Sequence, residues 1–351
     1  MYKFTKNIIN ENNSEWIIEP INKFTPIPPI CIATMLRRII LTNVPTLAIL
    51  YYNDETHDKI YIVENKTCLD NGFIKHRLST LPFNIRPDNT NTCRISYKSN
   101  GQLGNISTHQ FLIEIDGKHK PASEYIPDIY FHRLRTKDEN LEFQASLEIS
   151  CGEICGAHSP SGRISAIPIK LSDQEGPAKL TIETIEGITN YNPTHVFDIA
   201  IQISITMIEL LYDEVMILDP NTDFETMKWQ GDYTKYTAYK ITVGGEKTIS
   251  RLKTSPGKWG NTPLLPSKVR CLVTIAQVLQ EFIVASDSSF IHISYMTPHP
   301  LKKEVTIAMA FENESPENAK KKLLEQIFNL KDYITQNIHL KTAIIYALNV
   351  N

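Results

Sequence analysis

Apolar residues recur at helical spacing in four segments of this chain. The intervals predict amphipathic helices over about 30–43, 195–213, 270–285 and 315–338. The last segment has the most regular stripe, with an apolar residue every three or four positions. Its members are Ala319, Leu323, Ile327, Leu330, Ile334 and Ile338. A stripe sustained over this length indicates contact with other helices along the whole segment.

Each of the four predicted helices carries an apolar face that is too wide to remain in contact with water. We therefore expect the four helices to pack against one another along one intramolecular seam. The residues expected in this seam are Ile32, Leu36, Ile39, Ile203, Met207, Leu279, Leu323, Ile327 and Leu330.

Strand patterns occupy much of the remaining sequence. Short strand-like runs separated by turn residues, such as Phe111–Ile115 and Ile164–Ile169, predict a mixed, mainly β module from about 53 to 172. A polar stretch over 219–232 predicts a linker. Further strands are expected at Thr46–Tyr52, Leu180–Ile185, Tyr236–Val243, Phe290–Tyr295 and Glu304–Phe311.

The two halves of the chain share one order of elements: a helix with an apolar face, strands, and a second long amphipathic helix. This order predicts an α+β fold with two similar halves. The first half comprises 1–49 and 173–218, and a β-rich insertion domain at 50–172 interrupts it. A linker at 219–235 then leads to the second half at 236–351.

Composition and charge narrow the classes of function. The chain has 36 Lys and Arg residues and 39 Asp and Glu residues, which gives a net charge of -3. A protein that binds the phosphate backbone of DNA is usually basic, so we do not expect DNA binding to be the main role. Six irregularly spaced cysteines and no apparent secretory signal indicate a reducing compartment. The most apolar long segment, Val196–Tyr212, is interrupted by polar residues, so we expect no contact with a membrane.

One group of residues suggests a zinc site. Cys151, Cys155 and His158 could supply three ligands, but a closed zinc site needs four and commonly contains a CxxC pair. We therefore expect no metal. Nucleophile-elbow, zinc-protease and paired-carboxylate motifs are not found either, so no catalytic residue is predicted.

Three stretches of the first half resemble one known family. Met35–Ile49 (MLRRIILTNVPTLAI) resembles the ALRRILLSEVPTLAI signature of alpha-type RNA polymerase subunits, which include bacterial alpha and the third-largest subunit of the eukaryotic nuclear enzymes. Gly72–Pro82 (GFIKHRLSTLP) is similar to the EFIAHRLGLIPL stretch of that family, with Ser79 replacing a glycine. Cys155–Ser161 (CGAHSPS) resembles the KEHAKWSPV stretch of the family's inserted domain.

The second half is similar to the small partner subunit, the eleventh subunit of the nuclear enzyme. Tyr295–Ile307 (YMTPHPLKKEVTI) resembles YKVPHPLEHKIII, and Ser315–Ala319 resembles the SPQEA opening of the last helix. Thr274–Leu279 (TIAQVL) is similar to TLGNLL, with Ala276 and Gln277 in place of the usual Gly and Asn.

The resemblance implies an alpha-subunit-like dimerisation domain that forms as an intramolecular pseudo-dimer. In this family two such subunits pair through their helices and nucleate binding of the two largest subunits, and the largest subunit carries the catalytic magnesium. The implied function is a non-catalytic assembly scaffold of a multisubunit DNA-directed RNA polymerase, with no cofactor in this subunit. Its implied partners are the second-largest and largest subunits and the small assembly subunits, with DNA reached only through the complex.

The fusion resembles what nucleocytoplasmic large DNA viruses carry, and the richness in Ile, Asn, Lys and Thr agrees with an AT-rich genome. It implies viral transcription, located in a cytoplasmic viral factory and the virion, with the host nucleus as the alternative. Implied partner-binding residues are Arg37, Arg38, His76 and Arg77, although a structural role remains the favoured alternative for His76 and Arg77.

Two rival functions remain from other classes. A free-standing protein-interaction adaptor could reuse the dimerisation fold without joining a polymerase. The third hypothesis is an enzyme that uses Cys151, Cys155 and His158.

Overall fold

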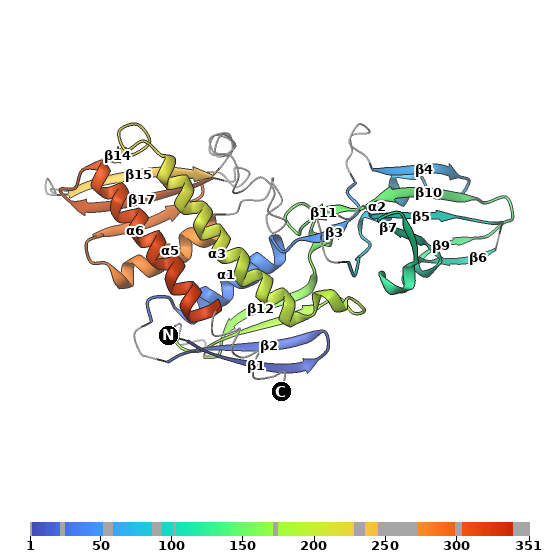
Figure 1. Ribbon diagram of the computed structural model, residues 1–351, viewed down its shortest axis with the longest axis horizontal. Helices are drawn as coiled ribbons and strands as arrows, with labels where there is room; N and C mark the ends of the chain where they lie inside the picture. The colour runs from blue at the N-terminus through green and yellow to red at the C-terminus, as the bar shows by residue number, and fades with distance from the viewer. Residues whose placement is uncertain are drawn as a thin grey trace.

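The computed structural model shows an α+β protein with several antiparallel sheets, which confirms the predicted fold class at this level (Figure 1). The structure describes residues 2–21, 25–51, 59–85, 93–101, 103–170, 175–227, 236–244, 272–298 and 304–339.

The α-helices are α1 (Pro29–Thr42), α2 (Asn71–Ser79), α3 (Pro193–Ile217), α5 (Val273–Ser286) and α6 (Pro316–Ile334). The strands are β1 (Tyr2–Asn10), β2 (Asn13–Pro20), β3 (Thr46–Ala48), β4 (Ile60–Asn65), β5 (Cys93–Lys98), β6 (Gly104–Ser107), β7 (Leu112–Ile115), β8 (Lys118–Pro121), β9 (Tyr130–Leu134), β10 (Leu141–Ser146), β11 (Glu148–Ser150), β12 (Ser161–Pro168), β13 (Ala178–Thr184), β14 (Glu225–Met227), β15 (Tyr236–Gly244), β16 (His292–Met296) and β17 (Glu304–Glu312).

Proline and capping residues determine where the two longest helices begin. Pro193 and Pro316 occupy the first turns of α3 and α6, where proline needs no hydrogen-bond acceptor for a backbone N–H. The side chains of Asn192 and Ser315 accept hydrogen bonds from backbone N–H groups in those turns. The last helix ends as α-helix at Ile334 and continues as a π-helical turn over Thr335–His339, close to the predicted end at 338.

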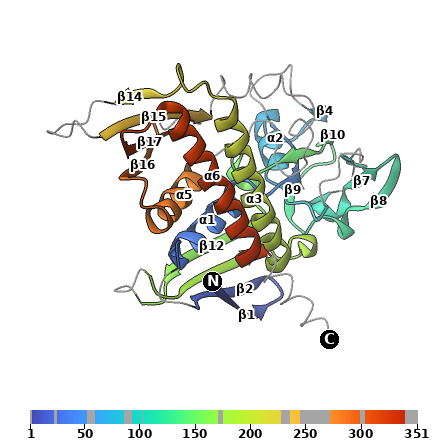
Figure 2. The same ribbon diagram turned by 60° about the vertical axis from the view of Figure 1, so that its left-hand side comes forward.

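The four long helices pack together in one hydrophobic core. α1 contacts α3 and α5, and α6 contacts the same two helices. Figures 1 and 2 show α3 and α6 side by side across the body of the molecule. The residues expected in the seam all lie buried in this core: Ile32, Leu36, Ile39, Ile203, Met207, Leu279, Leu323, Ile327 and Leu330. α3 is long and apolar enough to cross a membrane by length and composition alone, but here it is a largely buried core helix.

A four-stranded sheet with the order β1-β2-β13-β12 packs against α1 and α3. The hairpin of β1 and β2 was not predicted, because its residues mix Lys, Asn and Glu with apolar positions. β12 lies before the predicted end of the insertion at 172, but it belongs to the sheet of the helical body. It pairs with β13, with Ile164 opposite Ile182, and both side chains enter the core of the helices.

A second four-stranded sheet, with the order β14-β15-β17-β16, packs on α5 and α3. Its edge strand β14 corrects the predicted linker at 219–235, because Glu225–Met227 pairs with β15 and Phe224 is buried against Tyr239. Residues 228–235 of that linker, the start of the predicted helix at 270–285, and His299–Leu301 lie outside the described residues.

The insertion has its own hydrophobic core beneath a five-stranded sheet with the order β4-β10-β5-β7-β8. It extends from one side of the helical body along the long axis of the molecule (Figure 1). It also contains α2, which the mainly β prediction missed. Asp70 caps this helix by accepting a hydrogen bond from the Phe73 backbone N–H, and Ile74 and Leu78 are buried.

Candidate functional site

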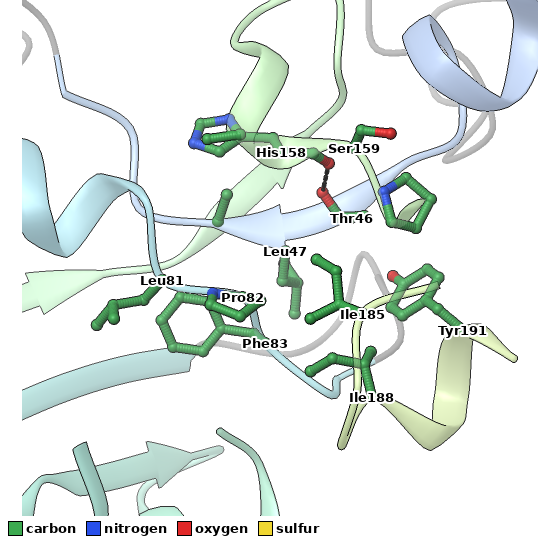
Figure 3. A pocket seen from close by; sticks show the side chains of 13 residues that line it. Thr46, Leu47, Leu81, Pro82, Phe83, His158, Ser159, Ile185, Ile188 and Tyr191 are labelled. Atoms are coloured by element: carbon green, nitrogen blue, oxygen red, sulfur yellow. Dashed lines mark hydrogen bonds between the residues drawn. The ribbon is translucent and has the colours of Figure 1, made fainter. Parts of the chain in front are cut away.

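The three stretches of the first half that resemble alpha-type polymerase subunits meet where the insertion joins the helical body (Figure 3). Thr46 comes from the first stretch, Pro82 from the second and His158 from the third. Together with neighbouring side chains they line a cavity of about 20 Å³. Segments that are far apart in the sequence therefore form one structural unit, which we call the junction.

His158 is the hydrogen-bonding centre of the junction. Its Nδ1 atom lies 2.7 Å from the Ser150 hydroxyl oxygen, and its Nε2 atom lies 2.9 Å from the Ser79 carbonyl oxygen. The hydroxyl of Thr46 donates to the backbone carbonyl of His158 at 2.7 Å. Only 5% of His158 is exposed, so these bonds are shielded from competing water.

The partners of His158 also determine its protonation. A carbonyl can only accept, so Nε2 carries the proton that bonds Ser79, and Nδ1 accepts from the Ser150 hydroxyl. Burial lowers the pKa of His158 below its usual value, with a smaller opposing contribution from the Ser79 bond. His158 is therefore a neutral structural residue at pH 7.

The turn before His158 lies against the end of α1. The backbone N–H of Glu153 donates to the Thr42 carbonyl at 2.9 Å, which satisfies one of the free carbonyls at the helix C-terminus. Gly152 permits this approach, because a Cβ at this position would lie 1.8 Å from the Leu41 carbonyl oxygen. The CxxxC segment thus packs closely on the helix that carries Arg37 and Arg38.

The geometry at His158 gives a reason to expect no zinc there. Both ring nitrogens are engaged by protein groups, and Cys151 is buried while Cys155 is partly buried. In the described part of the chain, no cluster of three or more His, Cys, Asp or Glu side chains is arranged to hold a metal ion. We predict that metal analysis of protein purified without chelator finds far less than one zinc per chain. About one zinc per chain would contradict this prediction.

Arg37 and Arg38 lie on the side of α1 that faces away from its buried stripe. Arg38 is exposed, and its guanidinium lies 3.3 Å from the side-chain oxygen of Gln277 on α5. Arg37 is partly buried. Arg38 therefore lies beside the neighbouring helix of the second half and remains accessible to a partner.

His76 and Arg77 lie on α2 in the insertion. Arg77 donates to the Tyr130 carbonyl at 3.1 Å and lies over the rings of Tyr130 and Phe131 at 5.9 and 5.5 Å. These contacts join α2 to β9 within the insertion and favour a structural role for Arg77. His76 is exposed, and its backbone carbonyl accepts from the Ser79 hydroxyl.

Two polar residues that join the insertion to the helical body were not predicted from the sequence. Asn84 and Asn190 exchange hydrogen bonds of 2.7 Å between the insertion and the turn before α3. No motif or spacing marks either residue, because an Asn in a loop is common and its partner is distant in sequence.

Comparison with known proteins yields a partial match. The chain is 33% identical over 84 residues to the DNA-directed RNA polymerases I and III subunit rpac1 of Dictyostelium discoideum, and this match covers 24% of the chain and 21% of the relative. The chain thus spans about a fifth of the length of this relative. No protein-family model matches it.

Proposed function

We propose that this chain is a non-catalytic assembly scaffold of a multisubunit DNA-directed RNA polymerase. The distant, partial match to an alpha-like polymerase subunit supports the assignment to a polymerase. The junction adds support from this chain itself, because three family-like stretches that are separated in sequence pack on one another around His158.

We also propose that the chain is a fused pseudo-dimer. The observation that carries it is the packing of equivalent helices: α1 contacts α5, and α3 contacts α6. Each half also supplies an antiparallel sheet, of which the first packs on α1 and α3 and the second on α5 and α3. Fusion would make the pairing of halves intramolecular and replace a bimolecular step with a high effective concentration.

In this proposal the chain nucleates association of the second-largest and largest polymerase subunits, together with small assembly subunits. We further propose that it serves transcription of a large DNA virus, in the cytoplasmic viral factory and the virion. Co-purification from the source followed by mass spectrometry tests the association with polymerase subunits. Stoichiometric large polymerase subunits support the scaffold, whereas a chain that purifies without them supports the free-standing adaptor.

The Arg pair provides a sharper test. We predict that the double variant Arg37→Glu, Arg38→Glu leaves the chain folded but abolishes capture of the second-largest subunit in a pull-down. Arg binds carboxylates or carbonyls through several hydrogen bonds at once. Loss of one partner of a buried interfacial charge pair weakens the free energy of binding by about 2–5 kcal/mol, and reversal of the charge should weaken it at least as much.

The charge-matched control is Lys118→Glu, Lys120→Glu on the exposed strand β8 of the insertion. It makes the same change in net charge far from α1 and should leave capture intact. Circular dichroism of both variants reports folding. Normal capture by the Arg variant would remove α1 from the proposed interface, and loss of its folding would give the pair a role in the core instead.

A further inference from the structure

The insertion is joined to the helical body by a narrow covalent connection. The chain leaves the body after β3 and returns through β11, and these strands pair only from Thr46 opposite Ser150 to Ala48 opposite Glu148. A two-stranded ribbon of this length is only marginally stable by itself and can bend or twist. Contacts outside the ribbon must therefore determine the direction of the insertion.

Residues 79–85 begin at the last residue of α2, and this residue makes the first of these contacts. The Ser79 carbonyl accepts a hydrogen bond of 2.9 Å from His158 Nε2. His158 is itself held on the body side by Ser150 and by Thr46. The end of α2 is therefore fixed to the turn that covers the C-terminus of α1.

The same segment is held again near its other end. The Asn84 side-chain oxygen accepts from the Asn190 backbone N–H at 2.7 Å, and the Asn190 side chain donates to the Asn84 carbonyl at 2.7 Å. The Asn84 amide nitrogen also donates to the Thr189 hydroxyl at 3.1 Å. These bonds attach the insertion to the short turn that leads into α3.

Apolar side chains from both parts surround the cavity at the junction. Leu81 and Phe83 from the segment line it, together with Ile185, Ile188 and Tyr191 from the body (Figure 3). Leu81, Phe83, Ile188 and Tyr191 are buried. The hydroxyl of Tyr191 donates to the Pro45 carbonyl at 3.1 Å, and it also lies 3.3 Å from the Ile85 carbonyl.

We propose that residues 79–85 form a two-point clamp, in which His158 and Asn84 are positioning residues that set the direction of the insertion relative to the helical body. A single attachment would leave a pivot. The two points are five residues apart, or up to about 17 Å along an extended chain, and so resist rotation about either one. This role belongs to the isolated chain and does not depend on the polymerase assignment.

The test measures the distribution of distances between spin labels on the two parts. One label is placed on Cys68, which is exposed in the insertion, and the other on exposed α6 through Lys321→Cys. All labelled chains also carry Cys31→Ser, Cys155→Ser and Cys271→Ser, so that these cysteines take no label. We expect one narrow distance peak in the parent chain and at least a doubling of its width in the double variant His158→Ala, Asn84→Ala, with each single variant intermediate.

The matched control removes a histidine and an asparagine that bond only within the insertion. His109 contacts the Ile126 carbonyl and the Asn140 side-chain oxygen accepts from the Ser99 hydroxyl, so His109→Ala, Asn140→Ala should keep the narrow peak. His158→Gln should restore much of the narrow peak, since its amide can donate to Ser79 and accept from Ser150. A merely structural loss of packing would not show this rescue.

Three results would overturn the clamp. The first is a narrow peak in the folded double variant. The second is equal broadening in the control pair, which would show that any loss of hydrogen bonds loosens the insertion. If the double variant fails to fold, the single variant Asn84→Ala decides the matter, and an unchanged peak in it overturns the second attachment point.

Discussion

Ile327→Asp lowers the free energy of unfolding by about 4 kcal/mol or more, because it places a carboxylate inside the four-helix core. Ile327 lies on the buried stripe of α6 and is 0% exposed. A charged oxygen there would lose its water without gaining a partner. Leu323→Asp, one turn earlier and also 0% exposed, should have an effect of similar size.

The adjacent residue on the same helix gives the control. Phe328 is 50% exposed on the outer side of α6, so Phe328→Asp should change the free energy of unfolding by less than about 1 kcal/mol. Urea denaturation followed by circular dichroism measures all three variants. If Ile327→Asp and Phe328→Asp unfold at the same urea concentration, α6 does not pack in the orientation described.

Gly152→Ala should lower the free energy of unfolding by about 3 kcal/mol, because there is no room for a side chain between the turn and α1. The added Cβ would lie 1.8 Å from the Leu41 carbonyl oxygen and 3.3 Å from the Ser159 Cβ. Backbone atoms cannot rotate away as a flexible side chain can. The turn would have to move off the helix and lose the bond from Glu153 to Thr42.

Gly156→Ala in the same turn is the matched control. No heavy atom lies within 4 Å of a Cβ built on Gly156. The free energy of unfolding of this variant should therefore differ from that of the parent chain by less than about 0.5 kcal/mol. Thermal or urea melts of the two alanine variants compare them directly. Equal stability of Gly152→Ala and Gly156→Ala would mean that the turn does not press on α1.

The candidate sites differed in how far they could be predicted. The helical spacing predicted that Arg37 and Arg38 cannot both point inward beside Ile32, Leu36 and Ile39, so at least one must project from α1, and Arg38 is the exposed one. His158 was singled out with Cys151 and Cys155 as a possible metal ligand, although no metal was expected, and its structural role was not predicted. Its actual hydrogen-bond partners, Ser79 and Ser150, carry no ligand pattern that a sequence reveals.

The sequence by itself determined the four amphipathic helices and their inward faces. A helical stripe such as Leu323, Ile327 and Leu330 repeats within a few residues, and the face that must leave water follows directly from that local spacing. Pro193, Pro316 and Ser315 likewise act on the turn in which they lie.

Only the tertiary structure decided which strands share a sheet and how the insertion is held. β2 pairs with β13, and Asn84 pairs with Asn190 across 106 residues of sequence. β12 belongs with the helical body although its alternation would suit the insertion equally well. Such pairings depend on the complementary edges and hydrogen-bonding groups that distant segments present once the core has formed, and a local pattern of apolar and polar residues does not specify them.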